Sequence, residues 1–179
     1  HGKPNKNAFF MELVVGKGGF GKVWKVKHRK SGQTFAMKQL QKYTINEESQ
    51  LVPYELAQIA DKACHPFLIN AHYAFQDSST LFLVLDYVNG GDLRYHITKQ
   101  RKFPEEQVRF FVCCILLGLE YLHSQKVIHR DLKPENLVFN ERGYLRITDL
   151  GISKEQLRGN GEDTSGTPGY MSPEVITHR

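Results

Sequence analysis

Residues 9–40 alternate between apolar and polar side chains and are rich in Val and Phe. Turn signals interrupt this alternation at 16–21 and at 30–32. Because a period of two is typical of half-buried strands, this stretch predicts three antiparallel strands joined by two turns. Residues 67–75 and 81–88 predict two further strands, so the first part of the chain is expected to form a small five-stranded lobe.

The region between the third and fourth of these strands predicts a helix. Thr44 and Glu47 have the spacing of a capping box, which would open a helical stretch. Pro53 interrupts this stretch, so the helix is expected to start again near Pro53 and to run to about Ala63.

Helical signals replace strand signals after the turn at 89–91. Asp92 can cap a short helix, and Pro104 followed by two glutamates predicts the start of a longer one. Within the longer helix Cys113 and Cys114 are expected to be core-facing or semi-buried. A hairpin turn at 140–143 and a strand at 144–148 should deliver Asp149, and 153–166 predicts a mobile loop. The apolar stripe of the longer helix consists of Val108, Phe111, Val112, Ile115, Leu119 and Leu122.

The stretch 127–139, VIHRDLKPENLVF, places polar side chains between two apolar patches that can anchor a loop. Asp131 can accept a proton from an attacking hydroxyl, and Lys133 can neutralise charge on a transferred phosphate. Asn136 can hold a metal ion. The same pattern also fits an amphipathic surface turn that is charged because it faces water. The rest of the chain has to decide between these interpretations.

A second candidate lies in the first predicted hairpin turn, GKGGFGKV at 16–23. The pattern alone is weak, because glycines also serve tight turns without a ligand. It lies between two strands rather than between a strand and a helix, which favours a flap over phosphates and argues against a dinucleotide fold. Lys38 follows in an apolar strand, where it can face solvent or, beside such a flap, point at nucleotide phosphates.

Composition narrows the class of protein. A chain of 179 residues suffices for one domain or two small lobes that share a cleft. The net charge of +5 permits nucleic-acid contact, but the one basic cluster, at 25–30, alternates with valines as a half-exposed strand does. The three cysteines lack metal-ligand spacing and favour a reduced, cytoplasmic setting. The longest apolar run, 110–119, is too short to cross a bilayer, and no signal peptide opens the chain.

Five motifs now occur in order along the chain: GKGGFGKV at 16–23, AMK at 36–38, HRDLKPEN at 129–136, DLG at 149–151 and SPE at 172–174. In this set and order the chain resembles the eukaryotic protein kinase family, over essentially its whole length. The resemblance implies an α+β, bilobal, protein-kinase-like fold. The N-lobe would span 1–85, with a five-stranded antiparallel sheet and one helix, and a hinge and partial helical C-lobe would span 86–179.

The resemblance implies ATP and Mg²⁺ as cofactors and assigns roles residue by residue. Asp131 would orient and deprotonate the acceptor hydroxyl, and Lys133 would contact the γ-phosphate. Lys38 would bind the α- and β-phosphates. Asn136 and Asp149 would ligate the magnesium ion, which prefers oxygen ligands.

The remaining implied contacts surround the nucleotide. The glycine turn would cover the phosphates with its backbone amides, Leu85 would be the gatekeeper, and Asp92 would reach the ribose or a substrate cation. Glu55 would pair with Lys38, with the glutamates at 47–48 as alternatives. The full implied set is Val15, Gly16, Lys17, Gly18, Gly19, Phe20, Gly21, Lys22, Val23, Ala36, Lys38, Leu85, Asp86, Val88, Asp92 and Val138.

Finer features concern the substrate. DLKPEN and GTPGY at 166–170 resemble Ser/Thr rather than Tyr kinases, and HPF at 65–67, GGDLRYH at 90–96 and PEEQVRFF at 104–111 resemble the AGC group. Within that group DLG and GYMSPE resemble receptor-kinase-like members and GGDLRYH the YANK-type members, so the subfamily stays open. Asp92 and Glu135 would form an acidic patch that favours Arg or Lys near the acceptor of a protein substrate.

Regulation and completeness are further expectations. An upstream kinase would phosphorylate Thr164, or Asp163 would supply a permanent negative charge to Arg130. The chain begins with His1 rather than Met, which suggests a fragment, and the resemblance implies more C-lobe helices after Arg179. The chain by itself is therefore expected to be unstable or inactive, with the apolar stripe of the predicted helix over 104–125 partly uncovered.

Two other functions compete with a catalytic kinase. A non-catalytic pseudokinase is disfavoured because Lys38, Asp131, Asn136 and Asp149 are all present. A basic nucleic-acid-binding module rests on the pI of about 9.1 alone and lacks the interleaved aromatic and basic residues of such surfaces. The sequence therefore favours a Ser/Thr protein kinase that transfers the γ-phosphate of ATP to a protein hydroxyl.

Overall fold

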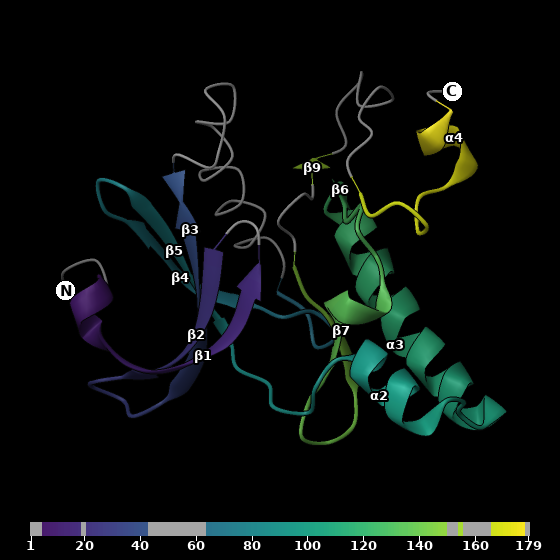
Figure 1. Cartoon of the computed structure of the whole chain (residues 1–179), viewed down its shortest axis with the longest axis horizontal. Helices are drawn as coiled ribbons and strands as arrows, with labels where there is room; N and C mark the ends of the chain where they lie inside the picture. Colours follow the sequence, from purple (N-terminus) through teal and green to yellow (C-terminus); the bar gives the residue numbers. More distant parts are fainter. Residues whose placement is uncertain (1–4, 19–20, 43–63, 150–153, 156–165, 178–179) are drawn as a thin grey trace. The chain divides into compact units, whose positions relative to one another are not determined.

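The computed structural model describes residues 5–18, 21–42, 64–149, 154–155 and 166–177 (Figure 1). The chain divides into two compact units. The first consists of residues 1–61 and 70–87, and the second of residues 62–69 and 88–179. The lobe boundary expected after residue 85 stays a prediction.

The first unit is built on a five-stranded antiparallel sheet with the strand order β1-β2-β3-β5-β4 (Figure 1). A short 3-10 helix, η1 (Lys6–Ala8), precedes it. The strands are β1 (Phe9–Gly18), β2 (Gly21–His28), β3 (Thr34–Gln41), β4 (Ala71–Gln76) and β5 (Thr80–Asp86). The five strands predicted for the first part of the chain are thereby confirmed.

The two faces of this sheet carry different side chains. Tyr73 and Phe75 pack against the larger buried cluster, which consists of Phe9, Val26, Phe35, Met37, Phe82 and Val84. A smaller cluster on the opposite face is formed by Leu40, Leu81 and Leu83, with Leu85 packed against it. Because side chains alternate along a strand, Lys38 of β3 lies on this second face together with Leu40.

The second unit is mainly helical. Helix α2 (Leu93–Gln100) begins after Asp92, whose carboxylate accepts a hydrogen bond from the backbone N–H of Tyr95 at 2.7 Å. Helix α3 (Glu105–Ser124) begins after Pro104 and carries two glutamates in its first turn, where they suit the positive end of the helix dipole. A short helix, α4 (Pro173–Ile176), follows Ser172. Both helix starts predicted from the sequence are confirmed.

Two small sheets frame the loops of the second unit. Strand β6 (Val127–Ile128) pairs with β9 (Lys154–Glu155), and β7 (Leu137–Phe139) pairs with β8 (Leu145–Ile147), both antiparallel. The 3-10 helix η4 (Pro134–Asn136) leads directly into β7. Gly90 donates its N–H to the Phe139 oxygen at 3.1 Å, and a Cβ on Gly90 would lie 2.4 Å from that oxygen. This close approach requires glycine at position 90. The sequence had indicated only that Gly90 belongs to a turn.

The predicted limits of two strands are wrong. The strand expected over 67–75 begins only at Ala71, because the preceding residues bond to β8 instead. Ile69 donates its N–H to the Ile147 oxygen at 2.9 Å, and Ile147 donates its own to the Phe67 oxygen at 2.8 Å. The strand expected over 81–88 runs from Thr80 to Asp86.

The buried face of α3 is rotated relative to the predicted stripe. Its fully buried residues are Cys114, Gly118 and Leu122, because the small Gly118 lets the helix approach β8 closely. Cys113 is exposed, so its predicted core-facing or semi-buried position is wrong, whereas the same prediction for Cys114 is confirmed, since it is buried. The exposed large apolar side chains of this helix are Val108, Phe110, Val112, Leu116 and Leu117. Of the predicted stripe, only Val108 and Val112 are among these exposed side chains.

Several predicted features lie outside the described residues. They include the capping box at Thr44, the helix near Pro53 to Ala63 and most of the loop over 153–166.

Replacing Gly118 with Leu is expected to lower the free energy of unfolding by about 1–3 kcal/mol, because overpacking forces neighbouring groups apart. A Cβ at this position would lie 2.9 Å from Ile147 Cδ1 and 3.2 Å from the Phe67 oxygen. Chemical denaturation monitored by circular dichroism measures the change. Leu116→Ala, at a side chain that is 57% exposed, is the control and should change stability by less than about 0.5 kcal/mol. A Gly118→Leu variant as stable as this control would contradict the packing.

Candidate active site

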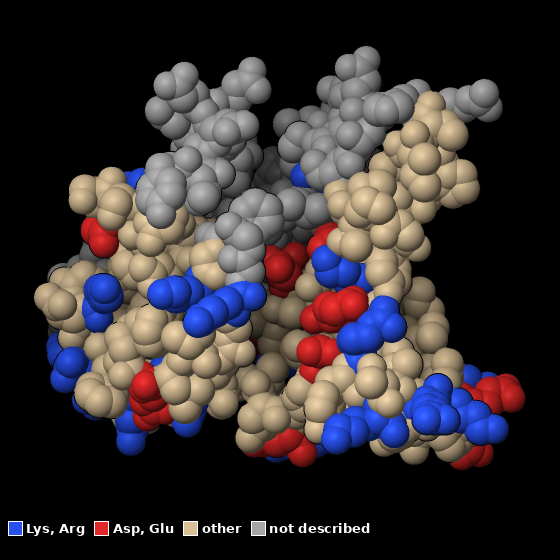
Figure 2. All heavy atoms as spheres, in the orientation of Figure 1, with Lys and Arg blue, Asp and Glu red and all other residues tan. Residues whose placement is uncertain are grey.

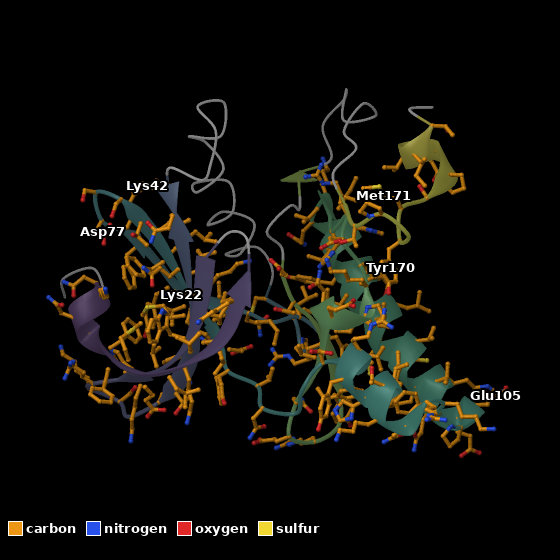
Figure 3. All side chains as sticks on the ribbon, in the orientation of Figure 1. Lys22, Lys42, Asp77, Glu105, Tyr170 and Met171 are labelled. Atoms are coloured by element: carbon orange, nitrogen blue, oxygen red, sulfur yellow. The ribbon has the colours of Figure 1, made fainter. Side chains whose placement is uncertain are left out.

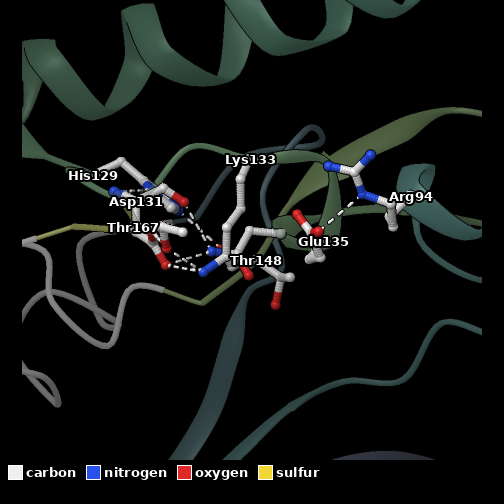
Figure 4. Close-up of polar contacts among 8 residues, drawn as sticks. Arg94, His129, Asp131, Lys133, Glu135, Thr148 and Thr167 are labelled. Atoms are coloured by element: carbon white, nitrogen blue, oxygen red, sulfur yellow. Dashed lines mark hydrogen bonds and ion pairs between the residues drawn. The ribbon is translucent and has the colours of Figure 1, made fainter. Parts of the chain in front are cut away.

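The loop between β6 and β7 brings Asp131, Lys133 and Asn136 together within the second unit (Figure 4). Lys133 Nζ lies 2.7 Å from Asp131 Oδ2. The Asn136 side-chain amide donates to the Asp131 backbone oxygen at 2.8 Å and to Asp131 Oδ2 at 3.1 Å. The three polar residues that the sequence singled out therefore form one hydrogen-bonded cluster, which the alternative of a simple solvated turn does not explain.

Thr167 joins this cluster from the segment before α4 (Figure 4). Its hydroxyl donates to Asp131 Oδ1 and accepts a hydrogen bond from Lys133 Nζ at 2.6 Å. The sequence predicted no role in the site for Thr167, which belongs to the GTPGY motif. No local pattern around Thr167 indicates this role, because its contact with Asp131 joins segments 36 residues apart.

The Asp131 carboxylate is kept ionised by its neighbours. Burial alone would raise its pKa, but hydrogen bonds from Lys133, Thr167 and Asn136 outweigh burial and hold the pKa below its usual range. An ionised carboxylate beside an ammonium group and a hydroxyl can accept a proton from an incoming hydroxyl. The cluster is thus suited to general-base chemistry next to a developing negative charge.

The backbone takes unusual conformations at two points of the site. Arg130 has φ of 66° and Asp149 has φ of 60°, in the left-handed region that costs a residue with a side chain of order 1 kcal/mol. One lies directly before Asp131, and the other follows the strand β8 and Thr148. Strained backbone conformations persist only where surrounding contacts hold them in place, and they are concentrated at functional sites. The positive φ values of Arg130 and Asp149 are therefore consistent with a functional loop.

His129 is buried and supports both strained segments. Its Nε2–H donates to the Thr148 oxygen at 2.9 Å, and its Nδ1 accepts from the Asp131 N–H at 3.3 Å. These bonds require the neutral ring with its proton on Nε2. Burial lowers the pKa of His129 although the Thr148 oxygen favours the charged form.

The lowered pKa of His129 predicts destabilisation by acid. As the pH falls below the ordinary histidine value of about 6.5, the unfolded chain takes up a proton that the folded chain resists, so the free energy of unfolding falls. Denaturation curves at pH 7.5 and 5.5 should show this loss in the wild type and a smaller loss in His129→Gln. The exposed His123 provides the control, since His123→Gln should keep the wild-type pH dependence. Equal pH dependence in all three proteins would contradict a neutral, buried His129.

Asn136 and Asp149 offer oxygen atoms that fit a magnesium ion. Asn136 is buried and uses its amide nitrogen towards Asp131, which leaves its oxygen as the atom to offer a cation. Magnesium in phosphoryl-transfer sites is held by one or two protein oxygens together with phosphates, so a single amide and a single carboxylate suffice. Among the described residues no group of three or more His, Cys, Asp or Glu side chains gathers as a separate metal centre.

The first unit, described by itself, carries a set of expected site residues that share one face of its sheet. Strand register places Val23 opposite Lys38, and Lys38 opposite Leu83. Two residues along, Ala36 lies opposite Leu85. Since directly opposed residues of antiparallel strands point to the same face, the expected nucleotide contacts Val23, Ala36, Lys38 and Leu85 line one surface.

The glycine turn between β1 and β2 is partly described. Gly16 lies opposite Val23, and the register shifts between Val14 and Gly16, so Val15 occupies a bulge. Gly21 has φ of 145°, and a Cβ there would lie 1.8 Å from the Gln39 oxygen of β3. Glycine at this position is therefore required by the sheet itself, whether or not a phosphate binds.

The other expected site residues are placed as follows. Asp86 ends β5, and its carboxylate accepts from the Asn70 N–H at 3.1 Å and lies 2.6 Å from His72 Nε2. Val138 is in β7 and forms an isolated bridge with Asp92. Lys17, Gly18 and Lys22 belong to the ends of β1 and β2, and Val88 begins the longer of the two segments that form the second unit. Gly19, Phe20, Glu55, Asp163 and Thr164, with the alternatives at 47–48, lie outside the described residues.

A second polar cluster lies next to the first. Arg94 Nε donates to Glu135 Oε1 at 2.9 Å (Figure 4). The Arg94 Nη2 donates to the hydroxyl of Tyr170, a residue that Figure 3 labels. The N–H of Glu135 and the Arg94 guanidinium together lower the pKa of the Glu135 carboxylate. Neither Arg94 nor Tyr170 was expected to be functional from the sequence.

The charges on the surface do not form a broad basic patch on the face shown in Figure 2. There the Lys and Arg side chains of the described residues are interspersed with Asp and Glu side chains. At one end of the sheet of the first unit, Lys42 Nζ donates to the Asp77 backbone oxygen at 2.6 Å (Figure 3).

Among helices in the described part of the chain, none has the length and hydrophobicity that a membrane crossing needs.

Comparison with known proteins places the chain in a family. Residues 10–179 match the family described as protein kinase domain. A RAC family serine/threonine-protein kinase homolog of Dictyostelium discoideum is 46% identical over 168 residues, which cover 91% of this chain and 38% of that protein. The serine/threonine-protein kinase Sgk1 of Gallus gallus is 41% identical over 180 residues, 98% of this chain and 41% of that protein. A probable serine/threonine-protein kinase of D. discoideum is 43% identical over 177 residues, 97% of this chain and 39% of that protein.

The chain therefore belongs to the protein kinase family. The resemblance to Ser/Thr kinases of the AGC group, read from the motifs, is confirmed by the Sgk1 and RAC-family relatives. The chain spans about two fifths of the length of the curated relatives that it matches.

Proposed function

We propose that the protein transfers the γ-phosphate of ATP to a serine or threonine hydroxyl of a protein substrate. The observation that carries this proposal is the hydrogen-bonded cluster of Asp131, Lys133, Asn136 and Thr167. Asp131 would take the proton of the acceptor hydroxyl while the Lys133 ammonium stabilises charge on the phosphoryl group in transit. Relatives named as serine/threonine-protein kinases support the same reaction.

The proposed cofactors are ATP and Mg²⁺. Lys38 would bind phosphates of the nucleotide, and the backbone of the glycine turn at 16–21 would cover them. Asn136 and Asp149 would hold the metal ion, whose charge offsets that of the phosphates. With ATP as the donor the reaction would take place inside the cell, a setting that also suits the three free cysteines.

The proposed partners are a protein substrate and an upstream kinase. Glu135 is the carboxylate offered to a basic substrate side chain near the acceptor, since it is exposed and one residue from Asn136. Asp92 is a second candidate, although one of its oxygens already caps α2. Thr164 is the proposed site of activating phosphorylation, with Asp163 as a permanent charge instead.

Phosphate transfer from radiolabelled ATP tests the reaction directly. The full-length protein that contains this chain, purified and incubated with Mg²⁺, labelled ATP and a mixture of unrelated acceptor proteins, should label serine or threonine, as shown by hydrolysis and separation of the phosphoamino acids. Omission of Mg²⁺ should abolish the label. Labelling of tyrosine alone, or no labelling with Mg²⁺ present, would contradict the proposal.

A further inference from the structure

One guanidinium group links three segments of the second unit. Arg94 stands in the first turn of α2, Glu135 lies in η4, and Tyr170 lies in the segment before α4. The Arg94 Nε bonds to the Glu135 carboxylate at 2.9 Å, and the Arg94 Nη2 bonds to the Tyr170 hydroxyl (Figure 4 shows the first of these contacts). The planar fork of arginine suits this arrangement, because its donors point in fixed directions.

This cluster is continuous with the cluster around Asp131. Glu135 is followed by Asn136, whose amide donates to Asp131. Tyr170 donates its backbone N–H to the Thr167 oxygen at 3.0 Å, and the Thr167 hydroxyl donates to Asp131. A substrate whose acceptor hydroxyl reaches Asp131 would therefore present its neighbouring residues close to Glu135 and Arg94.

The Arg94 contact changes what Glu135 can offer. A carboxylate beside an acceptor site would ordinarily attract a substrate Arg or Lys. Here the chain already supplies a guanidinium to that carboxylate, and the pair has no net charge. We propose that Arg94 is a specificity-determining residue, which competes with a basic side chain of the substrate for Glu135 and so weakens the preference for basic substrates. This inference rests on the proposed function.

The exposure of the pair indicates how strong the competition is. The side chains of Arg94 and Glu135 are 44% and 43% exposed, so water and salt screen the attraction between them. A substrate arginine can therefore displace Arg94 from Glu135. The ion pair of Arg94 and Glu135 thus lowers the preference for basic substrate residues without abolishing it. In the second acidic residue of the expected patch, Asp92, Oδ1 accepts from the Tyr95 N–H, so Asp92 can offer a substrate cation its other oxygen.

Peptide binding tests the inference without the need for phosphate transfer. All peptides carry Ala at the acceptor position. In one series a single Arg is placed at each flanking position in turn, and in the second series Gln is placed at the same positions. Fluorescence anisotropy at low salt gives the ratio of dissociation constants for Gln and Arg peptides. At the position that meets Glu135, this ratio should rise by about two- to fivefold from the wild type to Arg94→Ala. Added salt should reduce the difference.

A double variant and a matched control make the test specific. In Arg94→Ala with Glu135→Gln the gain should disappear, because the exposed carboxylate is gone. Arg109→Ala breaks another exposed ion pair of the second unit, that with Glu105 at 2.6 Å, and should leave the ratio unchanged. Tyr170→Phe removes one contact of Arg94 and should raise the ratio by less than Arg94→Ala does.

Two outcomes would overturn the role of Arg94: a ratio in Arg94→Ala equal to that of the wild type at every position, or a gain that persists in the double variant. Phosphate transfer to peptides of the same sequences with Ser at the acceptor position tests the proposed function separately. Transfer together with unchanged binding ratios would refute only the role of Arg94. A raised ratio without transfer would support Arg94 and contradict the kinase reaction.

Discussion

Replacement of Asp131 by Asn should lower the rate of phosphate transfer by about 10²–10⁴-fold, the usual contribution of a positioned general base. The carboxylate accepts from Thr167, Lys133 and Asn136, which keep it ionised. The amide has a similar size and can still accept hydrogen bonds through its oxygen, but it cannot take a proton. Single-turnover measurements with saturating Mg²⁺ and ATP would isolate this step, while nucleotide affinity should stay within a few-fold of the wild type.

Asp77→Asn provides the matched control for this loss. Asp77 lies in the turn between β4 and β5, where its Oδ1 accepts from the backbone N–H groups of Ser79 and Thr80 at 2.9 and 2.8 Å. An amide oxygen can accept the same bonds, so this variant should transfer phosphate at the wild-type rate. A similar rate in Asp131→Asn and in Asp77→Asn would remove Asp131 as the base and with it the proposed chemistry of the site.

The sequence was most informative where a local pattern determines a local structure. Alternating side chains in residues 9–40 predicted β1, β2 and β3, and Asp92 and Pro104 predicted the starts of α2 and α3. Asp131 and Asn136 lie in one loop between β6 and β7, so their short spacing in the sequence already favoured a common cluster.

Contacts between distant segments could not be read in this way. Thr167 reaches Asp131 from 36 residues away, and Tyr170 reaches Arg94 from 76 residues away. The face of α3 was misjudged for the same reason: periodicity showed that one side is apolar, but the small Gly118 facing β8 sets which residues are buried. Gly21 has a structural role that the sequence did not reveal: besides its expected place over the phosphates, it is needed for the close approach of β3.

Replacement of Asn136 by Asp should lower both activity and stability, and Mg²⁺ should restore part of the stability. The Asn136 amide nitrogen donates to the Asp131 backbone oxygen and to its carboxylate. A carboxylate at position 136 cannot donate, and it would place a second negative charge about 3 Å from the first in a buried position. Loss of the buried hydrogen bonds is expected to cost about 1–3 kcal/mol of unfolding free energy. Phosphate transfer should fall by at least about tenfold, because Asp131 loses a group that positions it.

Thermal melts with and without Mg²⁺ separate the two effects. A bound cation offsets the repulsion between the carboxylates, so Mg²⁺ should raise the Tm of Asn136→Asp more than that of the wild type. Asn140→Asp is the control: the Asn140 Oδ1 accepts from the N–H groups of Arg142 and Tyr144, both at 3.0 Å, and an aspartate oxygen can do the same. This control should keep the wild-type Tm and its response to Mg²⁺. If Asn136→Asp behaved like the control, Asn136 would neither hold Asp131 in place nor lie at the metal site, and the proposed magnesium ligands would have to be sought elsewhere.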